Sequence, residues 1–275
     1  RHPSCKLPSS QLPLDVFLRK ERKLSALLRI LGLPALFLSK VPGLRSVIKA
    51  LSTSVGQKLL MATSGLSLVG FLIVHLGGNL QLYAGEEVFN AYAAKLHSLG
   101  PLLAIAEIGL FSMFALHIGL AVSTAAMNST ARASSYAVKQ TKQGLFVLPS
   151  GGASNWMMVT GLLIFVFLVS HILDMKLKKG FGVSYPPAAA DAGDATNAFQ
   201  NVKAVLQHPP HAILYFVCLI ALGIHLSHGI RSALQTFGLN HKNWNFILRW
   251  TGFLLAWAIA GGFISVVAWA LAVKN

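Results

Sequence analysis

Four histidines lie inside long apolar segments of the chain: His75, His117, His171 and His225. An ionisable side chain is costly to place in such a segment, so its presence there suggests a function. Neutral imidazole is a good ligand for haem iron, and two histidines at one depth on different helices can bind the iron from both faces. The first chemistry that the sequence suggests is therefore haem ligation.

The positions of the histidines within their segments predict two layers. His75 and His171 lie 16 and 15 residues into segments that run in one direction, or roughly 24 Å at a helical rise of about 1.5 Å per residue. His117 and His225 lie 16 and 14 residues into segments that run the opposite way. We therefore expect His75 and His171 in an outer layer and His117 and His225 in an inner layer, roughly 15 to 20 Å apart. Haems at this separation would form an electron path across a membrane.

Other uses of these histidines fit the pattern less well. A zinc site needs three or four ligands at one level, and each predicted layer supplies two. A proton relay needs acidic side chains between the layers, and the sequence places none there. Haem remains the ligand class that the spacing favours.

His228 competes with His225, because residues three apart share a helical face. A weak internal repeat favours His225. The segments SGLSLVGFLIVHL and TGLLIFVFLVSHI align His75 with His171, and HIGLAVSTA and HLSHGIRSA align His117 with His225. His228 stays an alternative ligand.

Five nearly uncharged segments must position these histidines. The chain of 275 residues is 54% hydrophobic and 11% charged, which is far from the usual composition of a soluble protein. A helix of about 20 apolar residues crosses a hydrocarbon core of about 30 Å. The predicted fold class is all-α, an integral membrane five-helix bundle that binds two haems b. The predicted spans are residues 57–82, 101–127, 156–175, 211–235 and 246–273.

The basic residues are distributed unevenly along the chain. Eleven of the 23 Lys and Arg lie in residues 1–58, three lie in residues 128–155, and Arg231, Lys242 and Arg249 lie around the fourth connection. The positive-inside rule then predicts a cytoplasmic N-terminus and an outside C-terminus, in the inner (cytoplasmic) membrane of the cell. The formal charge of +15 is thus a topology signal, and we expect no nucleic-acid partner.

The sequence divides into two parts. Residues 1–54 are a basic extension in which Leu24, Leu27, Leu28 and Leu31 share a helical face, so we expect an interfacial helix on the cytoplasmic lipid surface. A targeting segment or a disordered arm is the alternative. Residues 55–275 are the predicted five-helix dihaem domain, with a flexible connection at 177–207.

Four polar side chains near the predicted layers are candidates for contacts to quinone or haem. Glu107 is the one carboxylate well inside a span, where apolar surroundings disfavour its charged form and suit a proton carrier. A helix–helix hydrogen bond would also explain it. Asn79 and Asp174, one turn beyond His75 and His171, would complete an outer pocket, or Asp174 would only cap its span. Arg231 would pair with a haem propionate or would be one more cytoplasmic charge.

The histidine motifs together resemble those of a known family. The segments are FLIVHLGGN, VFNAYAAKLHSLGP, ALHIG, FLVSHILD and HLSHGIRSALQTFGL. In order and spacing they resemble the single-chain, five-helix, dihaem cytochrome b anchor of type B succinate dehydrogenases and fumarate reductases (respiratory complex II). The resemblance covers roughly residues 55–273.

The resemblance implies a role as membrane anchor and electron carrier. His117 and His225 would ligate the haem nearer an iron–sulfur subunit, and His75 and His171 would ligate the distal haem. An iron–sulfur subunit and a flavoprotein (FAD) subunit would dock on the cytoplasmic face, and the flavoprotein would perform the succinate chemistry. Quinone, menaquinone in particular, would be the substrate in the membrane lipid. Whether the whole complex forms oligomers is left open. The alternatives are a dihaem cytochrome b of a hydrogenase or formate dehydrogenase and, from another class, a haem-free transporter.

Overall fold

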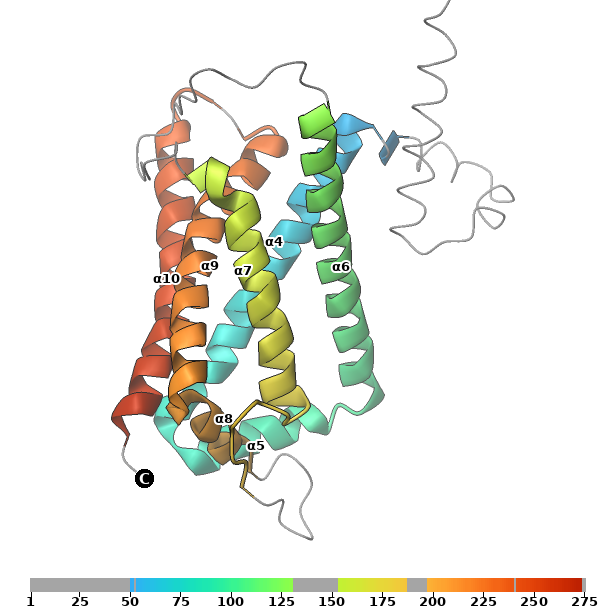
Figure 1. Ribbon diagram of the computed structural model, residues 1–275. Helices are drawn as coiled ribbons and strands as arrows, with labels where there is room; N and C mark the ends of the chain where they lie inside the picture. The colour runs from blue at the N-terminus through green and yellow to red at the C-terminus, as the bar shows by residue number, and fades with distance from the viewer. Residues whose placement is uncertain (1–49, 52, 131–152, 187–196, 240, 274–275) are drawn as a thin grey trace, which may run out of the picture.

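The computed structural model describes residues 50–51, 53–130, 153–186, 197–239 and 241–273. These residues form helices and no strand (Figure 1). The predicted interfacial helix lies outside the described residues and stays a prediction. In chain order the elements are α4 (Ser54–Asn79), a 3-10 turn (Leu80–Ala84), α5 (Glu86–His97), α6 (Pro101–Thr130), α7 (Ala153–His171), a π-helical turn (Ile172–Lys176), α8 (Ala198–Gln207), α9 (Pro209–Thr236) and α10 (Asn245–Ala272).

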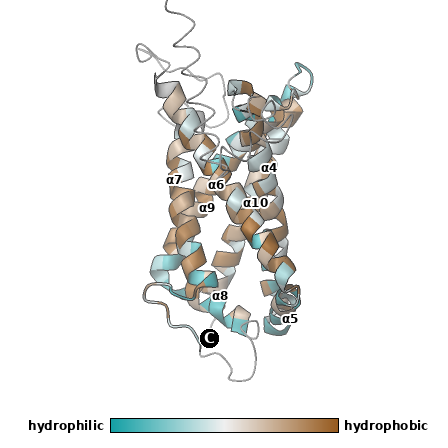
Figure 2. Ribbon diagram, turned by 90° about the vertical axis from the view of Figure 1, so that its right-hand side faces the viewer, coloured by the Kyte–Doolittle hydropathy of each residue, from teal (hydrophilic) through white to brown (hydrophobic). Residues whose placement is uncertain are grey.

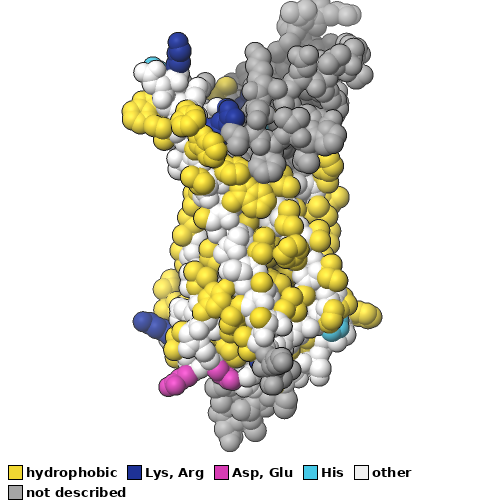
Figure 3. Space-filling model, turned by 90° about the vertical axis from the view of Figure 1, so that its left-hand side faces the viewer, with side chains coloured by type: hydrophobic (Ala, Val, Ile, Leu, Met, Phe, Trp, Pro, Cys, Tyr) yellow, Lys and Arg dark blue, Asp and Glu magenta, His cyan; other side chains and the backbone are white. Residues whose placement is uncertain are grey.

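Five of these helices are long and apolar enough to cross a membrane, as the sequence predicts: α4, α6, α7, α9 and α10. Apolar residues make up most of the length of these helices, and polar residues lie mainly at the two ends of the bundle (Figure 2). One side of the molecule shows a band of hydrophobic side chains, with acidic side chains at the end that carries α5 and α8 (Figure 3). The chain is therefore a multi-pass membrane protein by length and composition.

Local sequence signals explain where these helices begin. The Thr53 hydroxyl accepts a hydrogen bond from the Gly56 amide at 3.1 Å and caps the first turn of α4. Helix α9 begins with Pro209 and Pro210, which lack the N–H groups that a first turn leaves unpaired. Gly100 has a φ of 51°, a conformation that glycine adopts without steric cost, and it joins α5 to α6.

Helix α9 is the centre of the bundle. It packs against α10, α7 and α4, and it is the most buried of the five long helices. Small residues allow close approach, because Gly223 of α9 lies against Trp257 and Ala260 of α10. Helix α6, by contrast, packs mainly against α4, and Figure 1 shows it at the margin of the bundle. The inward faces of α4, α7 and α9 therefore surround the middle of the protein.

Two short helices cover one end of the bundle. Helices α5 and α8 lie across the ends of α4, α9 and α10, and the Asn90 side chain of α5 accepts a hydrogen bond from the Phe199 amide of α8 at 2.9 Å. The side-chain amide of Gln207 donates hydrogen bonds to the carbonyl oxygens of Ala270 and Val273 at the end of α10. The expectation of a flexible connection over 177–207 is thus wrong for residues 198–207. They form a helix because Phe199, Val205 and Leu206 bury one apolar face.

Two adjacent glycines give a matched test of packing at this end. A Cβ atom added at Gly78 would lie 2.4 Å from the Tyr92 hydroxyl, whereas one at Gly77 would meet nothing within 4 Å. We expect Gly78→Ala to lower the free energy of unfolding in detergent by about 1–3 kcal/mol, because the Tyr92 ring must move. Gly77→Ala should be neutral or stabilising, since alanine favours helix. Equal stability of the two variants would contradict this packing.

Candidate functional site

The rings of His75 and His171, here called the outer pair, face each other across α4 and α7. Their centroids are 5.8 Å apart, and the ring planes are nearly perpendicular at 84°. A phenylalanine one turn earlier stacks on each ring: Phe71 on His75 at 5.2 Å and Phe167 on His171 at 5.5 Å. The repeat seen in the sequence is thus repeated in space, and the structure brings together the two histidines predicted to share a layer.

The spacing of the outer pair suits two ligands on one metal atom. Two imidazoles are a donor set that haem iron takes, and these two come from different helices with centroids 5.8 Å apart. Asn79 also lies beside the pair, with its amide nitrogen 3.4 Å from Nε2 of His75 and 2.8 Å from the His75 carbonyl oxygen. The residues present therefore fit a haem, and Asn79 contacts one of its predicted ligands.

The inner pair, His117 and His225, is held by two equivalent hydroxyl groups. Ser64 Oγ lies 3.1 Å from Nδ1 of His117, and Thr160 Oγ1 lies 3.1 Å from Nδ1 of His225. Both rings are half-buried, and the two histidines are close enough to interact electrostatically. Among the described contacts none joins the two rings directly, so their pairing at one level stays a prediction.

A glycine follows each of these hydroxyl residues and gives the histidine ring space. A Cβ atom added at Gly65 would lie 3.2 Å from Cε1 of His117, and one at Gly161 would lie 3.6 Å from Cε1 of His225. The imidazoles therefore rest against the backbone of α4 and α7. Any larger residue at Gly65 would narrow the space that the His117 ring occupies.

The structure separates His225 from its competitor His228. His225 contacts α7 through Thr160, whereas the described neighbours of His228 are His225 itself and Arg231. Arg231 lies near Arg249 of α10, so two like charges face each other at this end of the bundle. This geometry favours His225 as the partner of His117 and leaves His228 closer to the basic end.

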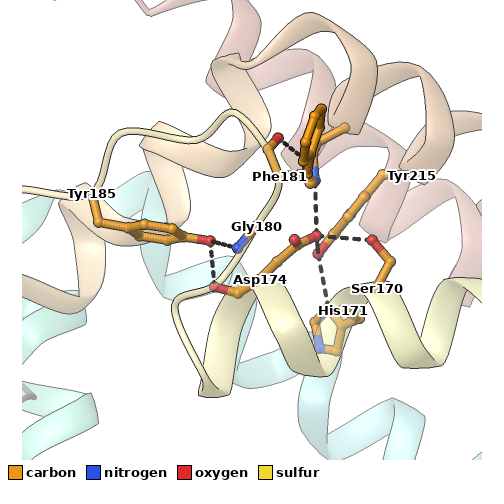
Figure 4. A network of polar contacts seen from close by, with 8 residues as sticks. Ser170, His171, Asp174, Gly180, Phe181, Tyr185 and Tyr215 are labelled. Atoms are coloured by element: carbon orange, nitrogen blue, oxygen red, sulfur yellow. Dashed lines mark hydrogen bonds and ion pairs between the residues drawn. The ribbon is translucent and has the colours of Figure 1, made fainter.

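Asp174 is the centre of a polar network at the end of α7 (Figure 4). It sits in the π-helical turn, a wider turn that often occurs at functional sites. Its Oδ2 atom accepts hydrogen bonds from Ser170 Oγ at 3.2 Å, Tyr215 Oη at 3.0 Å and His211 Nδ1 at 3.0 Å. The side chain is only 1% exposed. Asp174 therefore does more than cap its span in interfacial water.

His211 uses both ring nitrogens in this network. Its Nδ1 lies 3.0 Å from Oδ2 of Asp174, and its Nε2 lies 3.0 Å from the carbonyl oxygen of Phe181. A carbonyl oxygen only accepts, so Nε2 is the donor in the second contact. His211 and Asp174 lie within ion-pair distance, and together they join α9 to the turn after α7.

Tyr215 connects this ion pair to the outer pair. Its hydroxyl donates to Asp174 and lies 3.3 Å from Nδ1 of His171, so the histidine nitrogen is the donor in that second contact. Tyr185 closes the other side of the network by donating to the Asp174 carbonyl at 2.9 Å. Burial raises the pKa of the Tyr185 hydroxyl above the usual value for tyrosine, and the nearby Asp174 charge adds to this, so Tyr185 remains a neutral donor.

Glu107 has surroundings different from those predicted. Its carboxylate forms an ion pair with Lys176, and the two side chains are 38% and 47% exposed. The expectation that Glu107 is buried in apolar surroundings is wrong, because the end of the third span places Lys176 within reach of α6. Among the described residues no contact joins Glu107 to Asn79 or Asp174, and the predicted outer pocket around the three stays a prediction.

The fold and these contacts define a class of protein: a helical multi-pass membrane protein with two pairs of histidines inside the bundle. Among the described residues, no three His, Cys, Asp or Glu side chains converge as they would around a metal ion held by protein alone. Compared with known proteins, the chain matches no family, no curated protein and no solved structure.

Proposed function

We propose that this chain is the dihaem cytochrome b membrane anchor of a succinate:quinone oxidoreductase. It would pass electrons between an iron–sulfur subunit and quinone in the membrane. The observation that carries the proposal is the outer pair, whose rings come from separate helices and face each other at 5.8 Å. The family resemblance of the histidine motifs supports the choice of enzyme.

The residues of the chain would have distinct roles at the two haems. His75 and His171 would hold one haem, and His117 and His225 would hold the other. A bound haem b supplies one-electron transfer between its ferric and ferrous states. The phenyl rings of Phe71 and Phe167 stack on the outer pair, and Arg231 would balance the negative charge of a propionate at the inner haem.

A spectroscopic measurement tests the haem content directly. The detergent-purified complex should give a dithionite-reduced minus oxidised spectrum of b type, and a pyridine haemochrome assay should find two haems b per chain. One haem would mean that one histidine pair has only a structural role. A complex without haem would rule out the cytochrome and favour the transporter.

The partner subunits would show which enzyme this proposed dihaem cytochrome b belongs to. We propose a flavoprotein (FAD) subunit and an iron–sulfur subunit on the cytoplasmic face, with the chain in the inner membrane, its N-terminus inside and its C-terminus outside. The basic side chains of Arg231 and Arg249 lie at the end that this topology places in the cytoplasm, which supports it. Copurification of a hydrogenase or formate dehydrogenase instead of a succinate-oxidising flavoprotein would support the alternative.

Quinone reduction takes up protons, so a side chain that exchanges protons is needed beside the outer haem. Glu107 keeps this role in the proposal, and its carboxylate forms an ion pair with Lys176. We expect Glu107→Gln to slow quinone turnover about 10-fold or more, because general acid–base groups contribute about 10²–10⁴-fold to such steps. Both haem spectra should be unchanged. Lys176→Met is the control for loss of the ion pair, and equal turnover in Glu107→Gln and wild type would leave Glu107 a structural residue.

A further inference from the structure

We infer that Ser64 and Thr160 are positioning residues that fix the hydrogen of both inner-pair imidazoles on Nδ1 and leave Nε2 free to bind iron. The inference rests on the proposed haem function and concerns the same site. It extends the site from its ligands to the groups that orient them, which commonly influence ligand strength as much as the metal bond itself.

The direction of each hydrogen bond follows from the neighbouring backbone. The Ser64 hydroxyl donates its hydrogen to the Met61 carbonyl at 3.1 Å, and the Thr160 hydroxyl donates to the carbonyls of Trp156 at 2.9 Å and Met157 at 3.2 Å. A hydroxyl that has given its hydrogen to a carbonyl can only accept from the imidazole. Nδ1 is therefore the donor in both contacts.

The position of this hydrogen decides the role of the other ring nitrogen. A neutral imidazole has one N–H, so Nε2 then carries the lone pair that a metal needs.

The internal repeat makes the two arrangements equivalent. MATSGL contains Met61, Ser64 and Gly65, and MMVTGL contains Met157, Thr160 and Gly161 at the same spacing. Each segment orients a histidine of another helix, α6 or α9, rather than the histidine of its own helix. The hydroxyl and the glycine thus recur as a unit, one to accept the hydrogen bond and the other to admit the ring.

Redox titration of the two haems in the purified complex tests the role of the hydroxyls. Accepting a hydrogen bond from Nδ1–H makes an imidazole a stronger electron donor, which stabilises ferric iron. Ser64→Ala and Thr160→Val should therefore raise the midpoint potential of the same single haem. Ser64→Thr and Thr160→Ser keep the hydroxyl and should leave that potential unchanged. Unchanged potentials in Ser64→Ala and Thr160→Val, or equal shifts of both haems, would overturn the inference while leaving the dihaem function intact.

A measurement of the tautomer separates this inference from the proposed function. Nitrogen-15 NMR of the histidine-labelled chain as purified, in its reduced state, should show hydrogen on Nδ1 of both rings, with assignments from His117→Gln and His225→Gln. Hydrogen on Nε2 of either ring would overturn the inference whatever the haem content. A chain without haem that still carries hydrogen on Nδ1 would disprove the proposed function and support the positioning by Ser64 and Thr160.

Discussion

Replacing His75 with alanine should remove one of the two haems b that we propose for the purified complex, and His171→Ala should remove the same one. The reason is geometric, because the two rings face each other at 5.8 Å and would share one iron. His117→Ala and His225→Ala should both remove the other haem. The remaining haem in each variant is distinguished by its α-band position and midpoint potential, together with the haem-to-protein ratio.

His228→Ala is the matched control for these losses. It lies three residues from His225 on the same helix, yet the Thr160 hydroxyl contacts His225. We expect His228→Ala to retain both haems. Loss of different haems from His75→Ala and His171→Ala would show that the pairing is wrong, and loss of a haem from His228→Ala would move the fourth ligand to that residue.

Asp174→Ala should produce the largest loss of stability in the chain. It would leave the buried His211 ring without the carboxylate at its Nδ1, and breaking a buried ion pair from one side costs about 3–5 kcal/mol. The same change removes the acceptor for Ser170 and Tyr215. We expect a lower free energy of unfolding in a detergent-mixture titration followed by tryptophan fluorescence.

The exposed pair of Glu107 and Lys176 supplies the control for this experiment. It joins neighbouring helices at the same end of the bundle, but exposed ion pairs contribute only about 0–1 kcal/mol. Lys176→Met should therefore cost far less than Asp174→Ala. A double-mutant cycle with His211→Ala should give a coupling energy above about 0.5 kcal/mol. Additive effects of the two changes would show that Asp174 and His211 do not form the pair described here.

Much of the fold could be predicted because lipid imposes simple rules on sequence. A spanning segment must be helical, long and nearly uncharged, so all five spans agree with α4, α6, α7, α9 and α10. The short helices were harder to foresee. Helix α8 follows a stretch rich in alanine, and its helical structure depends on burying Phe199 and Leu206 against the bundle rather than on local pattern alone.

The site was only partly predictable from the sequence. Helical periodicity places His75 and His171 at one depth, but it cannot say which hydroxyl reaches which ring, because Ser64 and His117 are 53 residues apart. The repeated S/T-Gly-Leu motif was a usable signal for Ser64 and Thr160. The contact between His211 and Asp174 depends on the π-helical turn, which no pattern of residues in the sequence predicted.

The crossed arrangement of the histidine pairs has a consequence for how the protein is made. Each pair takes one ring from the first two spans and one from α7 or α9. A nascent chain that has released only α4 and α6 into the membrane therefore holds half of each pair and no complete one. Helix α9 enters the membrane after α4, α6 and α7, and it is the principal packing partner of its neighbours. Insertion of α7 is thus the step that brings His75 and His171 together, and insertion of α9 adds the second ring of the inner pair and the core of the bundle.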